Sequence, residues 1–175
     1  MDLIGTRILT FVGDLYEELE LWYPKYRLEE AGAEVVMAGL AKTKYSGKHE
    51  YPAQADIAVE GVHERDFDGL YIAGGFMPDI LRRDAHVLSL TRSFFSAGKL
   101  VGLICHAGWI PISAGIVRGK RVTGTPAIKD DLINAGATWV DEPLVVDGNL
   151  ISSRRPADLP LFGRALVDFL TNNTR

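Results

Sequence analysis

The sequence predicts an α/β protein in which helices cover both faces of a mainly parallel sheet, a three-layer α/β/α sandwich. Apolar runs that end in glycine, such as Arg7–Gly13 and Asp68–Gly75, are typical of central parallel strands. Segments with helical spacing of apolar residues alternate with these runs. In Lys99–Ile112 a buried strand stops at a sharp turn and a helix begins. The 175 residues suffice for one domain, expected over residues 1–175.

The chain opens with a predicted right-handed βαβ unit. Arg7–Gly13 is its first strand, Leu15–Gly32 its helix and Ala33–Gly39 its second strand. Pro24 removes a hydrogen bond inside the helix and should bend it. The apolar residues of this helix are Leu19, Trp22, Tyr23, Tyr26 and Leu28.

The middle of the chain returns to the sheet after an excursion. Lys42–Val62 is polar and ends in an alternating stretch, which indicates a short hairpin or edge extension that leaves the main sheet. Asp68–Gly75 is the third core strand, and Pro78 fits the first turn of a short helix. Ala85–Gly98 is a longer helix, whose apolar side carries Val87, Leu88, Leu90, Phe94 and Phe95.

The last part of the chain begins with the strand Leu100–Ile104 and a helix that ends near Gly115. The remaining predicted elements are strands at Arg121–Gly124, Thr138–Val140, Leu144–Val146 and Asn149–Ser153, and helices at Ile128–Ala135 and Pro156–Thr171.

Composition excludes several classes of function. The net charge is −4 and there is no basic stripe, so we expect no nucleic-acid partner. The single cysteine excludes an internal disulfide, and nothing resembles a zinc ligand cluster, so no metal is expected. No apolar run approaches the roughly 18 residues of a membrane helix, and the first residues do not form a signal peptide. We therefore expect no membrane partner and a cytoplasmic location.

The only cysteine, Cys105, stands where the predicted strand turns into a helix. This edge of an open α/β sheet is where ligands bind. The amino end of a helix favours a thiolate, and Ala107 and Gly108 leave room for a strained turn like a nucleophile elbow. We hypothesise that Cys105 is a nucleophile; the alternative is a buried apolar core residue.

Three further features can converge with this cysteine, because the carboxyl ends of parallel strands share one edge. Glu20 has apolar neighbours, so its carboxyl either points inward with a raised pKa or is solvated. Gly74 and Gly75 form either an oxyanion hole together with the amide of His106, or a plain turn. His106 could act as a base if another group orients its ring.

Other polar residues are expected to be structural or solvated. These are Glu17 and Glu18 as a solvated face, His49, His63 and His86 as solvated side chains, and Asp130, Asp131 and Asp158 as carboxylates at helix starts. Trp109 and the pair Arg154–Arg155 could border the pocket.

Several motifs together resemble one known family. They are EELELWYPKYRLEEAG, FDGLYIAGGFMPD, GKLVGLICHAGWIPISAGIVRGKRVTG and SSRRPADLP, with TKYSGKHEYP and PAIKDDLINAGATWVDEPLVVDGN between them. In this order they resemble the PfpI-type intracellular proteases. That superfamily also contains the parkinsonism-associated deglycase and the class I glutamine amidotransferases. The resemblance implies a flavodoxin-like sheet with a nucleophile elbow.

The resemblance also implies roles for individual residues. Cys105 would be the nucleophile, His106 its adjacent partner, and Glu20 the carboxyl that contacts the cysteine. Gly75 and the amide of His106 would bind an oxyanion. The family's protease proposal adds a glutamate from a neighbouring subunit to orient the histidine. Asp79 stands at that position and is one methylene shorter.

The resemblance implies a cofactor-independent cysteine hydrolase or lyase that acts on small carbonyl compounds or glycated amines. Two alternatives stay open: an intracellular cysteine peptidase, and a redox-sensing or stress-protective chaperone with an oxidisable cysteine. Glutaminase activity is not expected, because residues 151–161 contain neither histidine nor glutamate. A homodimer or higher homo-oligomer is implied as well.

Overall fold

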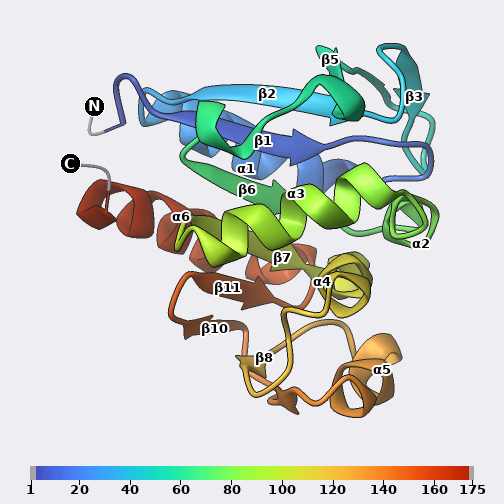
Figure 1. Ribbon diagram of the computed structural model, residues 1–175, viewed down its shortest axis with the longest axis vertical. Coiled ribbons are helices and arrows are strands. Elements are labelled where there is room, and N and C mark those ends of the chain that lie inside the picture. The colour runs from blue at the N-terminus through green and yellow to red at the C-terminus, as the bar shows by residue number, and fades with distance from the viewer. Residues whose placement is uncertain (1–2, 174–175) are drawn as a thin grey trace.

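A seven-stranded sheet forms the centre of the protein in a computed structural model that describes residues 3–173 (Figure 1). The predicted domain limits, residues 1 and 175, lie outside this range. The strand order is β10-β11-β7-β6-β1-β2-β5. All neighbouring strands are parallel except β10 and β11. The strands are β1 (Arg7–Phe11), β2 (Glu34–Gly39), β5 (Ile57–Ala58), β6 (Gly69–Ile72), β7 (Leu100–Ile104), β10 (Leu144–Asp147) and β11 (Leu150–Ser153).

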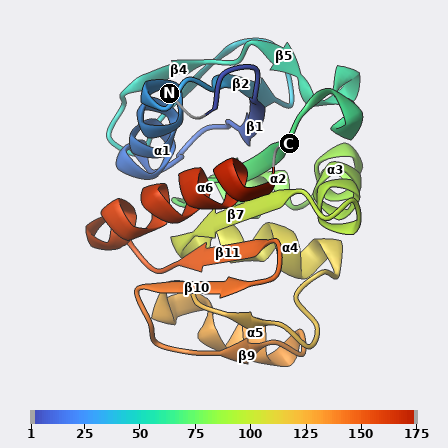
Figure 2. The same cartoon turned by 90° about the vertical axis from the view of Figure 1, so that its left-hand side faces the viewer.

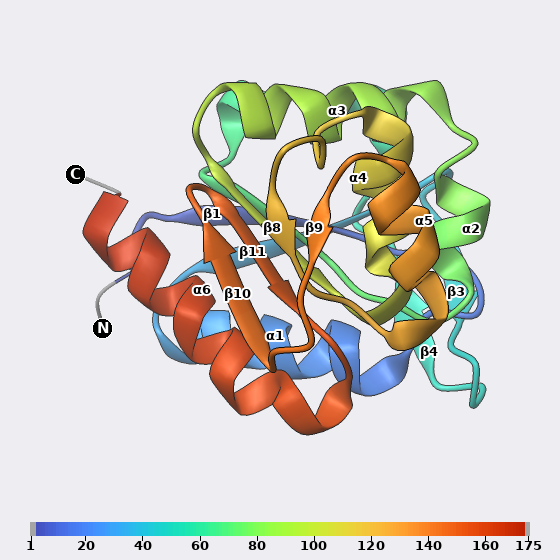
Figure 3. The same ribbon diagram turned by 90° about the horizontal axis from the view of Figure 1, so that it is seen from below.

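Helices cover both faces of the sheet, as predicted. Helices α1 (Glu18–Glu30) and α6 (Leu159–Asn173) lie together on one face, and α3 (Ala85–Ser96) and α4 (Trp109–Ala114) lie on the other (Figures 2 and 3). Two shorter helices, α2 (Met77–Leu81) and α5 (Lys129–Asn134), flank α4. The parallel core β2-β1-β6-β7-β11 has the flavodoxin-like order.

The alternation of side chains along the strands builds one hydrophobic cluster on each face. In β1, Leu9 and Phe11 belong to one cluster and Ile8 to the other. Phe94 of α3 fills the first cluster and Phe162 of α6 the second, both fully buried. Burying a side chain of this size stabilises the fold by roughly 1.5–3 kcal/mol. The strand β7, which leads to the cysteine, is buried along its whole length and is therefore firmly placed.

The excursion at residues 42–62 is a hairpin, but it does not stay outside the main sheet. Strands β3 (Lys44–Ser46) and β4 (Pro52–Gln54) pair with each other, whereas β5 joins the edge of the main sheet beside β2. The alternating stretch is therefore split between two sheets. A further parallel pair, β8 (Arg121–Val122) and β9 (Thr138–Trp139), lies beyond β10.

Helix α1 differs from its prediction at its start and on its surface. It begins at Glu18, because the Glu17 carboxylate accepts a hydrogen bond from the N–H of Glu20 and caps the helix. Of the apolar residues expected in this helix, Leu19 and Tyr26 are more than half exposed. Helix α3 follows its prediction, with Val87, Leu90 and Phe94 buried. Among the described residues, no helix is long and apolar enough to cross a membrane.

Candidate active site

Cys105 lies at a strained turn at the carboxyl edge of the sheet. Strand β7 ends at Ile104, Cys105 has a φ of +62°, and a 3₁₀ turn over Cys105–Gly108 leads into α4. A left-handed conformation costs a residue with a side chain on the order of 1–3 kcal/mol and persists only when the surroundings impose it. Gly124 packs so closely that an added Cβ would lie 3.2 Å from the Cys105 carbonyl oxygen. The predicted elbow is thus present.

Glu20 points inward and is completely buried. Its Oε2 accepts a hydrogen bond of 2.8 Å from the N–H of Gly74, while Oε1 has no hydrogen-bond partner among residues 3–173. A Cβ on Gly74 would lie 2.4 Å from Oε2 of Glu20 and 2.9 Å from Cβ of Cys105. Only glycine at position 74 therefore allows the carboxyl and the cysteine to come together.

Glu20 raises the pKa of Cys105, whereas Cys105 lowers the pKa of Glu20. Burial and the charge of Glu17 raise the pKa of Glu20 to about 8, against the opposing effect of the Gly74 N–H. Burial and the negative charge of Glu20 raise the pKa of Cys105 to about 12, and the N–H of His106 opposes this. When Glu20 is protonated, its negative charge no longer raises the pKa of Cys105, and its O–H can donate a hydrogen bond to the sulfur. The pair is therefore arranged to share one proton.

This electrostatic balance corrects one expectation. The partial positive charge at the amino end of a helix does not hold Cys105 as a thiolate, because burial and the Glu20 carboxylate outweigh it. Ionisation of the sulfur requires that a neighbouring group take or keep a proton.

His106 also contacts the sulfur of Cys105. Its Nδ1 lies 3.2 Å from Sγ of Cys105. Burial and the positive charge of Lys48 lower the pKa of His106, which favours the neutral form of its ring. The ring of Trp109 packs against the imidazole, with 5.2 Å between ring centroids. Trp109 thus borders the site, as the sequence had left open.

The two glycines of the predicted oxyanion hole have different environments. The N–H of Gly74 already donates to Glu20 and is not free for a substrate oxygen, which corrects its predicted role. Among residues 3–173, the N–H of Gly75 donates to no acceptor. Gly75 has a φ of +82°, and a Cβ there would lie 2.3 Å from the Leu15 carbonyl oxygen. Position 75 therefore accepts only glycine, because any side chain there would collide with the backbone of Leu15.

Asp79 lies on α2 and forms an ion pair with Arg83, four residues later and just past the end of that helix. Its side chain is 43% exposed. Within one chain, the Asp79 carboxylate is thus paired with Arg83. Contact with His106 of a neighbouring subunit remains a prediction.

Three residues near the site, Glu17, Glu18 and Lys48, were not predicted to belong to it. Glu17 and Glu18 do not form a solvated face: Glu17 is 6% exposed and caps α1, and Glu18 accepts a hydrogen bond of 2.6 Å from the backbone N–H of His49. Lys48, on the β3–β4 hairpin, lies 4.0 Å from Glu17, and its charge lowers the pKa of both Glu20 and His106. These contacts span about thirty residues, so local spacing gave no sign of them.

The remaining polar residues serve the fold or lie elsewhere. Asp158 is buried against Arg154, which also pairs with Asp141, and the His49 ring is 71% exposed. Asp131 accepts a hydrogen bond from the Trp109 indole. In the described part of the chain, no three His, Cys, Asp or Glu side chains are grouped to hold a metal ion.

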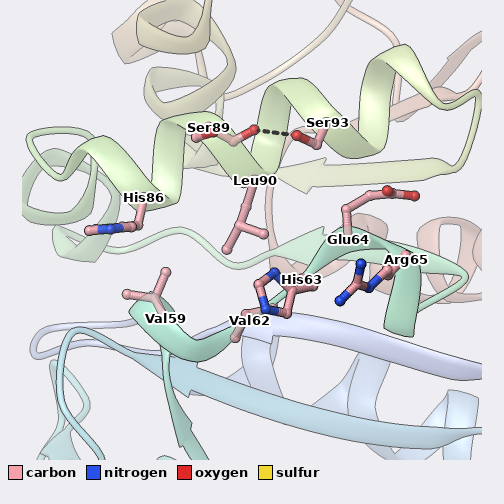
Figure 4. A pocket seen from close by; sticks show the side chains of 9 residues that line it. All are labelled: Val59, Val62, His63, Glu64, Arg65, His86, Ser89, Leu90 and Ser93. Atoms are coloured by element: carbon pink, nitrogen blue, oxygen red, sulfur yellow. Dashed lines mark hydrogen bonds between the residues drawn. The ribbon is translucent and has the colours of Figure 1, made fainter.

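A hollow of about 310 Å³ lies apart from these residues, between α3 and the segment 59–65 (Figure 4). His63 and His86 border it, together with Glu64, whose carboxylate pairs with Lys99. None of its lining residues belongs to the Cys105 site.

A parallel α/β sandwich with a cysteine at a strained strand-to-helix elbow and a buried carboxyl beside it defines a class of elbow-containing α/β proteins. Within that class, the chain belongs to the DJ-1/PfpI family, whose model matches residues 6–169.

Relatives from archaea and a solved structure support this assignment. The chain is 44% identical over 164 residues to a protein of Pyrococcus abyssi named deglycase PYRAB04690, and 40% identical to deglycase PfpI of Pyrococcus furiosus. Each match covers 94% of this chain and 99% of the relative. A two-domain protein of Anabaena variabilis with DJ-1/ThiJ/PfpI-like and ferritin-like domains matches with a TM-score of 0.93 and 38% identity. That match covers 95% of this chain and 48% of the other, so the chain spans about half of that protein.

Proposed function

We propose that this protein is a cysteine-dependent deglycase-type enzyme that acts on small carbonyl compounds or glycated amines. The observation that carries the proposal is that the Cys105 sulfur lies 3.2 Å from Nδ1 of His106 and interacts with the buried carboxyl of Glu20. The relatives named deglycases, at 40–44% identity over nearly the whole chain, support the same reaction class.

In the proposed first step, neutral His106 takes the proton of the Cys105 thiol. The sulfur forms a bond to the carbonyl carbon, and the electron pair of the C=O bond moves to oxygen. That oxygen accepts hydrogen bonds from the N–H groups of Gly75 and His106. Protonated Glu20 then gives its proton to this oxygen, which leaves a neutral hemithioacetal on Cys105.

A glycated amine in its aminocarbinol form would react at the corresponding carbon. The carbon–sulfur bond forms as the carbon–nitrogen bond breaks, and the amine leaves with the proton that Glu20 supplies. A carboxylic acid with a pKa near 8 is suited to this role, because it still holds its proton at neutral pH.

The ion pair between Asp79 and Arg83 does not favour the peptidase alternative, since peptide hydrolysis needs an organised base. We propose that the chain forms a homo-oligomer. The exposed apolar side chains of Phe76 and Ile80, which flank Asp79, support this proposal.

The test compares three substrates for the wild-type protein and Cys105→Ala: methylglyoxal, a methylglyoxal-modified amino acid, and an unmodified peptide. We expect wild-type turnover of the first two, and loss of at least about 100-fold in Cys105→Ala. Turnover of the peptide alone would support the peptidase instead. Stoichiometric oxidation of Cys105 without turnover of any substrate would support the redox alternative.

A further inference from the structure

His106 can serve Cys105 only if its ring is held in one orientation. In many such sites a carboxylate or carbonyl bonds the second ring nitrogen. Among residues 3–173, the His106 ring has one hydrogen-bond contact, with Cys105 Sγ, and one aromatic contact, with the indole of Trp109. Residues 106 and 109 are three positions apart across the turn into α4, a spacing that brings side chains against each other.

The indole of Trp109 is itself contacted by residues of, or next to, neighbouring helices. Its Nε1–H donates a hydrogen bond of 2.8 Å to Oδ2 of Asp131, at the start of α5. The guanidinium of Arg82, which follows α2, lies 5.9 Å from the indole ring. Arg82 is fixed in turn, because its Nε donates 2.8 Å to the hydroxyl of Ser113 on α4.

We propose that Trp109, anchored by Asp131 and Arg82, is the positioning residue that keeps the His106 imidazole turned toward the Cys105 sulfur, in the place where a carboxylate would otherwise orient the ring. This inference rests on the proposed function in one respect only: it assigns the oriented ring to proton transfer from the sulfur. The charged groups around the pair are Glu17 and Glu20 at the start of α1 and Lys48 on the hairpin, with Arg82 and Asp131 next to the indole.

The experiment uses the fact that the chain contains one cysteine. The rate of alkylation by iodoacetamide then reports Cys105 alone, without any substrate, across pH 5–10. The variants are Trp109→Phe, Trp109→Leu and Asp131→Ala. Asp130→Ala is the matched control, because Asp130 precedes Asp131 in the same helical turn and does not bond the indole.

We expect Trp109→Leu and Asp131→Ala to slow alkylation at pH 7 by about tenfold or more and to shift the pH profile toward that of His106→Ala. Trp109→Phe keeps an aromatic ring but loses the hydrogen bond to Asp131, so its alkylation should slow as in Asp131→Ala, and Asp130→Ala should match the wild type. In a His106→Ala background, Trp109→Leu should add nothing.

The proposal is overturned if folded Trp109→Leu keeps the wild-type profile, or if its effect is undiminished in the His106→Ala background. Should Trp109→Leu fail to fold, Asp131→Ala against Asp130→Ala gives the same decision. Absence of turnover by the wild-type protein would overturn the proposed function, yet the alkylation profiles would still test the role of Trp109.

Discussion

Glu20 is the residue on which the chemistry of the site most depends, because an ionisable group has been buried next to sulfur. Its completely buried carboxyl keeps one oxygen without a hydrogen-bond partner in the described chain. Such an oxygen is costly unless it carries a proton or meets a donor. Cys105 and the substrate are the groups to which it can give that proton.

The pKa of Glu20 makes stability depend on pH. A folded-state pKa of about 8 lies above the ordinary value of 4.5, so the stabilising contribution is complete below pH 4.5 and is lost as pH rises through 8. We expect the free energy of unfolding of the wild type to fall between pH 5 and pH 8 relative to Glu20→Gln, by on the order of a few kcal/mol. Urea denaturation at both pH values tests this. Glu30→Gln, at the exposed end of α1, is the control, and equal pH dependence in Glu20→Gln and wild type would contradict the assignment.

Gly74 is the second residue whose identity the site requires. An added methyl group would collide with Glu20 Oε2 at 2.4 Å and with Cys105 Cβ at 2.9 Å. Gly74→Ala should therefore destabilise the fold by about 1–3 kcal/mol and displace the carboxyl from the sulfur. Gly61→Ala is the matched control, since its Cβ would meet nothing closer than 3.9 Å. Thermal denaturation of the two variants decides, and an equal effect of both changes would count against this role of Gly74.

At the scale of elements, the residue that caps the amino end of α1 also influences the active site. Glu17 caps the helix, and its charge raises the pKa of Glu20. Glu17→Ala should cost about 0.5–2 kcal/mol of stability through loss of the cap. It should also lower the pKa of Glu20, which the pH at which Glu20 titrates in ¹³C NMR spectra would measure. An unchanged or higher titration point would show that the Glu17 charge does not reach Glu20.

Helices and strands that depend on the pattern of neighbouring residues in the sequence were predicted well. The strand before Cys105 is a continuous apolar run, and the glycine that follows several strands marks their ends. The start of α1 was misplaced, because Glu17 is an unusual cap and its role depends on where Glu20 points. The burial of Glu17 and Glu18 could not be foreseen either, since Lys48 and His49 reach them from a hairpin about thirty residues away. The N–H of Gly74 donates to Glu20, whereas the N–H of Gly75 has no acceptor among residues 3–173. This difference likewise depends on three-dimensional contacts.

On the scale of the whole molecule, apolar side chains at the outer end of the site remain exposed. Phe76 is 63% exposed, Leu15 45% and Ile80 38%. Phe76 and Leu15 are adjacent, because the Leu15 carbonyl accepts a hydrogen bond from the Phe76 N–H. Exposed apolar groups of this size commonly mark association surfaces.

We therefore expect Phe76→Asp to lower the mass of the particle in sedimentation velocity to that of a single chain. Ile133→Asp changes a comparably exposed residue on α5, away from this group, and should leave the mass unchanged. A wild-type protein that sediments as a single chain at micromolar concentration would exclude the proposed oligomer.

Reaction at one sulfur atom is the central claim, and partial alkylation of the single cysteine tests it most directly. Samples treated with increasing iodoacetamide are divided between intact-mass spectrometry and a methylglyoxal turnover assay. The account predicts that turnover falls in proportion to the alkylated fraction of Cys105 and reaches zero when alkylation is complete. Turnover that persists in fully alkylated protein would contradict it.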